Sequence, residues 1–199
     1  MNGLPCSAAC ERNQEPIFAC LRDVLADCTR VVEIGSGTGQ HAACFAPRLP
    51  GLHWIATDLQ ANHAAIRAWI EHSGAENIEG PLTLDTLQAR WPDLGAVDGA
   101  FSANTAHIMA EPAVVAMFAG LGERLPAGAP FCLYGPFVEQ GRHTSEGNRR
   151  FDTDLRAGGQ GMGVRDLGWL LQVAAVAGFE LETVQAMPAN NRVLVWRRT

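Results

Sequence analysis

The chain has 199 residues, of which 47% are hydrophobic and 18% are charged, a balance typical of a soluble globular protein. All 15 basic residues are arginine, and a net charge of −6 argues against a nucleic-acid-binding surface, which needs a basic stripe. No run approaches the roughly 18 apolar residues of a membrane span, and no signal peptide is visible. The six cysteines form no zinc-binding pattern. We therefore expect a single cytoplasmic domain over residues 1–199, with no metal and no membrane or nucleic-acid partner.

Segments of strand length alternate with segments of helix length along most of the chain. Strands are expected at residues 31–34, 52–57, 81–84, 97–103 and 130–134. Helices are expected at residues 16–26, 41–49, 62–72, 111–124 and 165–177. Two last strands, at 179–185 and 193–196, are joined by a short turn and must pair antiparallel. The pattern predicts an α/β fold: a mostly parallel sheet with helices on both faces and an antiparallel hairpin at its end.

Two segments fall outside this alternation. Residues 1–28 precede the first strand, and we expect them to form an N-terminal cap segment whose helix covers one mouth of the ligand site. Residues 135–164 are rich in glycine and polar residues, with a short helix expected at 148–157. Loops of this length are usually lids or binding loops. We expect this one to be an insertion on the substrate side.

Three alternating glycines, Gly35, Gly37 and Gly39, connect the first predicted strand to a helix. Glycine allows positive φ values and a close approach to a ligand, and the helix start offers unpaired N–H groups. The third glycine comes one residue too early for the nicotinamide fingerprint, and no Gly-Lys-Ser/Thr follows, which excludes a P-loop. With Glu33 two positions before the first glycine, the spacing resembles motif I of class I S-adenosylmethionine-dependent methyltransferases.

Polar residues follow the carboxyl ends of the predicted strands, where ligands bind in folds of this kind. Asp58 follows the second strand, where a carboxylate can accept hydrogen bonds from ribose hydroxyls. Asp85 follows the third strand, where class I methyltransferases commonly hold the adenine amino group. Asn104 follows the fourth, at a position that borders the methionine part of the cofactor and the methyl acceptor. A helix-cap or turn role is the alternative for Asp58 and Asp85.

His107 is the histidine near this predicted site that could take a proton at neutral pH, so it is a candidate general base, with a packed structural residue as the alternative. Methyl transfer otherwise needs an in-line acceptor, excluded water and a free lone pair. No Asn-Pro-Pro-Tyr motif follows the fourth strand, which disfavours methylation of nucleobases or glutamine. We therefore expect a small-molecule acceptor and leave open whether its reacting atom is O, S/Se or N.

Over nearly its whole length the chain resembles the methyltransferase-like 26 group, a domain-of-unknown-function family of class I methyltransferase-like proteins. The stretches that carry the resemblance are residues 7–13, 16–17, 33–41, 91–92, 104, 107–108, 134–137, 148, 151–152, 155–156, 163–166 and 187–191. The resemblance implies a Rossmann-like class I methyltransferase fold with a seven-stranded sheet. It also implies S-adenosylmethionine as cofactor and S-adenosylhomocysteine as product, but it supplies no substrate. Residues 105–106 and 158–162 depart from the family pattern.

The expected site residues fall into three groups. Contacts to the cofactor are expected from Arg12, Asn13, Glu33, Gly35, Ser36, Gly37, Gly39, Asp58, Leu59, Asp85 and Asn104. Catalytic roles are expected for His107, Asn104 and Tyr134. Contacts to the acceptor are expected from Tyr134, Phe137, Asn148, Asp152 and Arg165. Two other functions stay open: a cofactor-binding or scaffold protein without catalysis, and a nicotinamide oxidoreductase. The sequence does not indicate an oligomeric state.

Overall fold

The computed structural model describes residues 3–199, so the first two residues of the expected cap segment lie outside the described part of the chain. The main sheet has seven strands in the order β3-β2-β1-β4-β5-β10-β9, and a second sheet has the order β7-β6-β8. The main sheet is mostly parallel and ends in antiparallel strands, so the predicted fold class is confirmed. The chain divides into two compact units, one ending at Phe101 and the other covering Ser102–Thr199. The single domain stays a prediction.

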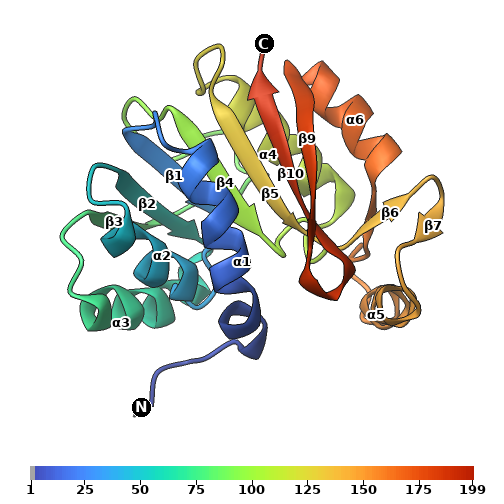
Figure 1. Ribbon diagram of the computed structural model, residues 1–199, viewed down its shortest axis with the longest axis horizontal. Helices are drawn as coiled ribbons and strands as arrows, with labels where there is room; N and C mark the ends of the chain where they lie inside the picture. Colours follow the sequence, from blue (N-terminus) through green and yellow to red (C-terminus); the bar gives the residue numbers. More distant parts are fainter. Residues whose placement is uncertain (1–2) are drawn as a thin grey trace. The chain divides into compact units, whose positions relative to one another are not determined.

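The first unit carries parallel strands and the helices that follow them. Its elements are α1 (Ala8–Val24), β1 (Arg30–Ile34), α2 (Gln40–Phe45), η1 (Ala46–Arg48), β2 (His53–Asp58), η2 (Gln60–Asn62), α3 (His63–Ser73), β3 (Ile78–Thr83) and the start of β4 (Gly99–Ala103). β1 pairs in parallel with β2 and β4, and β2 pairs in parallel with β3. In Figure 1, α2 and α3 lie next to each other beside these strands. The core is an aromatic cluster in which Phe45, Trp54 and Phe101 make edge contacts.

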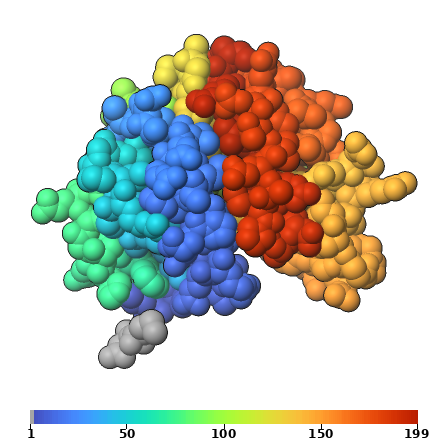
Figure 2. Space-filling model, in the orientation of Figure 1, coloured from blue at the N-terminus to red at the C-terminus, as the bar shows by residue number. Residues whose placement is uncertain are grey.

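Helix α1 begins eight residues earlier than the sequence predicted. Ser7 is its N-cap, with the side chain accepting a hydrogen bond from the N–H of Cys10, and Pro16 lies inside the helix. The predicted start at residue 16 was wrong, because the helix begins at Ala8 and continues through Pro16, although proline lacks the N–H of a helix interior. The buried side chains of α1 include Ile17 and Leu21. It contributes to the blue surface seen in Figure 2.

The second unit combines a hairpin-ended sheet with a small separate sheet. Its remaining elements are α4 (Glu111–Gly122), β5 (Pro130–Gly135), β6 (Phe137–Glu139), β7 (Arg142–His143), α5 (Glu146–Ala157), β8 (Arg165–Asp166), α6 (Leu167–Val176), β9 (Phe179–Met187), η3 (Pro188–Asn190) and β10 (Asn191–Arg198). β10 pairs antiparallel with both β5 and β9. Phe118 makes edge contacts with Phe131, Phe179 and Trp196, and these four rings form the core of the unit.

The expected insertion contains more regular structure than predicted. β6, β7 and α5 all lie within it, and β8 follows directly. A helix from residue 165 was wrong, because Arg165 and Asp166 form β8 and the Asp166 side chain then caps α6. The predicted 41–49 helix was also too long, since α2 ends at Phe45 and a 3-10 turn follows. Within residues 3–199, none of the helices has the length and apolar character needed to cross a bilayer.

Candidate functional site

The turn after β1 holds three glycines in the left-handed region. Their φ values are 75° at Gly35, 60° at Gly37 and 88° at Gly39. The N–H of Gly35 donates to Thr57 O over 3.0 Å, which fastens the turn to the end of β2. A Cβ on Gly39 would lie 2.9 Å from Cα of Ile66 in α3, whereas a Cβ on Gly37 would meet nothing within 4 Å. Gly39 is therefore needed for packing, and Gly37 is the glycine beside open space.

Asp58 closes β2 and braces the turn. One carboxylate oxygen accepts the N–H of Gly37 over 2.6 Å, and the other accepts the N–H of Leu59 at 2.7 Å and Nδ2 of Asn62 at 2.8 Å. Two oxygens offer about four lone-pair positions, so about one remains for a ligand hydroxyl. Asp58 is buried, whereas the neighbouring Leu59 is 51% exposed. This pair offers a carboxylate acceptor and an apolar surface next to the open side of the glycine turn.

Glu33, the acidic residue before the turn, is buried at 1% exposure. Its carboxylate accepts hydrogen bonds from Ser36 Oγ at 2.9 Å and from Trp54 Nε1 at 3.1 Å. Burial raises the pKa of Glu33 to about 7, although both hydrogen bonds oppose the rise. Glu33 therefore changes its protonation state near neutral pH.

The start of α1 is fastened to the glycine turn by Gln40, a residue that the sequence analysis did not select. Gln40 Oε1 accepts the N–H of Ser7 at 2.5 Å and the hydroxyl of Thr38 at 2.9 Å. One residue further along, His41 Nε2 lies 2.8 Å from Asn13 Oδ1. Burial lowers the pKa of His41 to about 4. The only feature of the sequence that indicated a role for Gln40 and His41 is that they directly follow the glycine motif.

Arg12 and Asp85 complete the expected cofactor residues of the first unit. Arg12 is exposed on α1, with its side chain in solvent. Asp85 accepts the N–H of Leu87 at 3.0 Å, which is the turn role left open by the sequence. The main chain still brings this segment to Asp58, because the N–H of Leu84 donates to Asp58 O at 3.0 Å.

The expected catalytic residues lie in the second unit. Asn104 has a φ of 60°, and its N–H donates to Tyr134 O at 2.8 Å, so β4 ends beside β5. The Tyr134 hydroxyl accepts Nδ2 of Asn191 at 2.8 Å. His107 is 6% exposed and meets the Phe151 ring edge-on. Burial, with a smaller effect of the nearby Arg165 charge, lowers the pKa of His107 to about 4.

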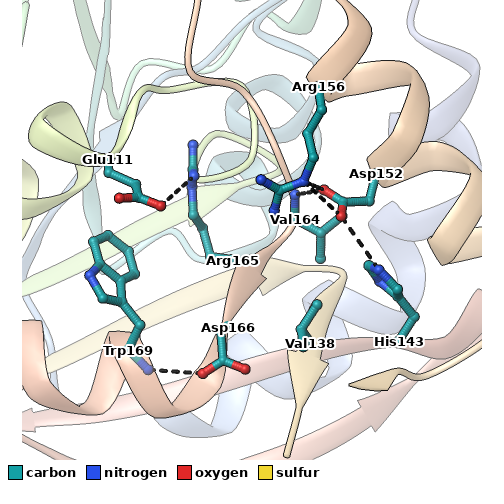
Figure 3. A pocket seen from close by; sticks show the side chains of 9 residues that line it. All are labelled: Glu111, Val138, His143, Asp152, Arg156, Val164, Arg165, Asp166 and Trp169. Atoms are coloured by element: carbon teal, nitrogen blue, oxygen red, sulfur yellow. Dashed lines mark hydrogen bonds and ion pairs between the residues drawn. The ribbon is translucent and has the colours of Figure 1, made fainter. Parts of the chain in front are cut away.

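Most of the expected acceptor-binding side chains are buried or form hydrogen bonds within the protein. Phe137 is 1% exposed, and Asn148 donates to Thr144 Oγ1 at 2.9 Å and to Asn190 O at 3.2 Å. Of the expected acceptor-binding residues, Asp152 and Arg165 line a common pocket. The volume of that pocket is about 210 Å³, and its lining consists of Glu111, Val138, His143, Asp152, Arg156, Val164, Arg165, Asp166 and Trp169 (Figure 3).

Arg165 and Asp152 are both extensively bonded in this pocket. The Arg165 guanidinium donates to main-chain oxygens of Ala106, Met109 and Gly161. Asp152 accepts the N–H of Val164 at 2.7 Å and Nε of Arg156 at 3.0 Å. His143, Asp166 and Trp169 were not predicted as site residues, because they come from two-residue strands and the start of a helix, which carry no periodic signal. Among residues 3–199 we find no cluster of three or more His, Cys, Asp or Glu residues suited to a metal ion.

The sheet order, with a glycine turn after β1 and an antiparallel hairpin at the C-terminal end, defines the class I methyltransferase fold. A family model described as "Protein of unknown function (DUF938)" matches residues 4–198, and the chain belongs to that family. The methyltransferase-like 26 name stays a prediction.

Solved structures with this fold share little sequence with the chain. An O-methyltransferase family protein from Burkholderia thailandensis superposes with a TM-score of 0.82 at 17% identity, over 94% of this chain and 56% of that one. Mitomycin 7-O-methyltransferase MmcR gives 0.82 at 14% identity, over 96% and 55%. PigF, solved with SAH, gives 0.80 at 18% identity, over 94% and 56%. The chain thus spans about half the length of these proteins, and the likeness is one of fold.

Proposed function

We propose that this protein is an S-adenosylmethionine-dependent methyltransferase that acts on a small molecule. The observation that carries the proposal is the joint placement of Gly37 and Asp58. A left-handed glycine beside open space and a carboxylate with about one acceptor position left fit a ribose-bearing ligand. Similarity of fold to O-methyltransferases and to PigF, solved with SAH, supports this choice of cofactor.

In the proposed site, Asp58 accepts a ribose hydroxyl and Leu59 packs on the purine. Glu33, Ser36 and the N–H groups of the glycine turn hold the amino-acid end together with Arg12 and Asn13, and Asp85 receives the adenine. The bound cofactor supplies an electrophilic methyl group. The protein contributes orientation and exclusion of water.

The proposed acceptor side uses Asn104 and Tyr134 to orient the reacting group. His107 is neutral at pH 7 with a pKa of about 4, so it accepts a hydrogen bond more readily than it removes a proton. We therefore propose that the acceptor reacts as an anion, or as an amine with a free lone pair, rather than through deprotonation by His107. The weak basicity of His107 also favours the second function, a cofactor-binding protein without catalysis.

Two measurements separate these functions. Isothermal titration with S-adenosylhomocysteine and with NAD tests the cofactor, and tight binding of NAD alone would indicate an oxidoreductase. Single-turnover incubation of the protein with methyl-labelled S-adenosylmethionine and a small-molecule extract then tests catalysis. Label in a small organic product supports the methyltransferase, whereas tight binding without any transfer supports the binding protein.

A further inference from the structure

The pocket of the second unit is built on a row of side chains across the small sheet. Val138 in β6 pairs directly with His143 in β7 and with Asp166 in β8. Directly paired residues project from the same face of a sheet, so these three side chains line the pocket together. Trp169 follows in the first turn of α6. In Figure 3, Trp169, Asp166 and Glu111 lie on one side of the pocket, opposite Asp152, Arg156 and His143.

The positive charges of the pocket already have partners. Arg156 is bound to the Asp152 carboxylate at 3.0 Å, and Arg165 is 3% exposed with its donors on three main-chain oxygens. Arg165 also lies 3.4 Å from Glu111. Asp166 is the one charged residue of this lining for which the described part of the chain supplies no oppositely charged partner. The lining therefore has an uncompensated negative charge beside an indole ring.

Two polar atoms of the lining, one on Asp166 and one on His143, have no hydrogen-bond partner among residues 3–199. One oxygen of Asp166 accepts the N–H of Trp169 at 3.0 Å, and the other has no partner among residues 3–199. His143 Nε2 lies 3.4 Å from Asp152 Oδ2. His143 Nδ1 is buried without a partner in the same described range. A ligand with N–H donors can bind the unpartnered oxygen of Asp166.

We propose that this pocket binds a small organic cation with N–H donors, such as an alkylammonium ion. The ammonium group lies between the Asp166 carboxylate and the face of Trp169, which combines a charge-assisted hydrogen bond with a cation–π contact. The proposal concerns binding alone and holds whether or not the protein transfers methyl groups.

Three compounds of nearly one shape test the charge: 3,3-dimethylbutylamine, 3,3-dimethyl-1-butanol and 3,3-dimethylbutanoate. Binding is measured in the cofactor-free protein at pH 7 from the NMR shift of the Trp169 indole N–H, which is assigned with Trp169→Phe. We expect the amine to bind about tenfold tighter than the alcohol, with the carboxylate weakest. Tightest binding of the carboxylate, equal binding of all three, or no binding of the amine up to about 10 mM would each overturn the proposal.

Asp166→Asn is the deciding variant, because asparagine is as good an N-cap as aspartate and preserves the start of α6. We expect the variant to lose about tenfold in affinity for the amine and none for the alcohol. Asp154→Asn is the matched control, since it removes the same charge from an exposed residue of α5 outside the pocket. Circular dichroism confirms folding of both variants. Unchanged amine affinity in folded Asp166→Asn, or an equal loss in Asp154→Asn, would overturn the proposal.

Discussion

The N–H of Gly37 donates to the Asp58 carboxylate over 2.6 Å, so the open glycine and the end of β2 are held together by the protein itself. The acceptor proposed for the ribose therefore also shapes the turn. Substitution of Asp58 changes both the ligand contact and the conformation that receives it.

Asp58→Ala should weaken binding of S-adenosylhomocysteine by about 1.5–3 kcal/mol, the range for a hydrogen bond to a charged group. It should also lower stability, because three donors lose their acceptor. Isothermal titration and thermal melting measure the two effects. Asp23→Ala, at an exposed position of α1, is the control. Unchanged affinity in a folded Asp58→Ala protein would refute the ribose role.

Gly37→Ala and Gly39→Ala form a matched pair, since both glycines have positive φ. Each variant should lose about 1 kcal/mol of stability from backbone strain. Gly39→Ala should lose about 1–3 kcal/mol more, because its Cβ would lie 2.9 Å from Cα of Ile66. Gly37→Ala should mainly lose cofactor affinity. Urea unfolding with titration of S-adenosylhomocysteine distinguishes the two, and equal stabilities would contradict the packing role of Gly39.

Glu33 should make stability fall as the pH rises. Its pKa is about 7 in the folded protein against 4.5 for an ordinary glutamate, so between these values the unfolded chain ionises first and binds fewer protons. The Glu33 contribution should decrease by up to about 3 kcal/mol across this window. Glu33→Gln should remove that decrease, because glutamine stays neutral. Parallel pH–stability curves for the two proteins, measured by urea unfolding, would contradict the raised pKa.

His41 and His107 should act in the opposite pH direction. Both have pKa values lowered from 6.5 to about 4 by burial, so the unfolded chain takes up protons first as the pH falls from 6.5 towards 4. Their stabilising contributions should be complete above the ordinary histidine pKa and lost progressively below it. NMR of imidazole-labelled protein should show both rings neutral down to about pH 5. A titration midpoint near 6.5 for His107 would restore it as a general base.

Asp152 should matter far more to stability than its exposed partner Arg156. Asp152→Asn weakens a buried acceptor of the Val164 N–H and of Arg156, and we expect a loss of about 2–3 kcal/mol. Arg156→Ala removes a largely exposed side chain and should cost about 0–1 kcal/mol. Urea unfolding of the two variants measures the difference. A larger loss in Arg156→Ala would show that the ion pair, not the main-chain hydrogen bond, holds this segment.

The elements of the fold were predicted most accurately where a regular hydrophobic pattern occurred next to a characteristic turn residue such as glycine. Strand alternation located β1, β2, β5 and the C-terminal hairpin, and the glycine spacing located the turn. Prediction failed at α1, where polar residues and Pro16 concealed a helix that starts at Ala8. It also failed at β6, β7 and β8, which are two or three residues long. Strands this short depend on their pairing partners rather than on a pattern of their own.

Site residues followed the same rule. The places of Glu33 and Asp58 in the fold were predictable, because their spacing from the glycines puts them near the ends of strands, whereas their cofactor roles stay a prediction. Gln40 was not, because its role depends on the distant Ser7 N–H. Asp166 and Trp169 line a pocket only through the pairing of β8 with β6, which no local signal encodes.

The tip of the β9–β10 hairpin holds the start of α5 through a single main-chain atom, since Asn190 O accepts from Thr144 at 3.1 Å and from Asn148 at 3.2 Å. Any amino acid supplies a carbonyl oxygen. This contact to α5 therefore depends on the shape of the turn and not on the Asn190 side chain, and the left-handed φ of 59° at Asn190 favours glycine, asparagine or aspartate at this position.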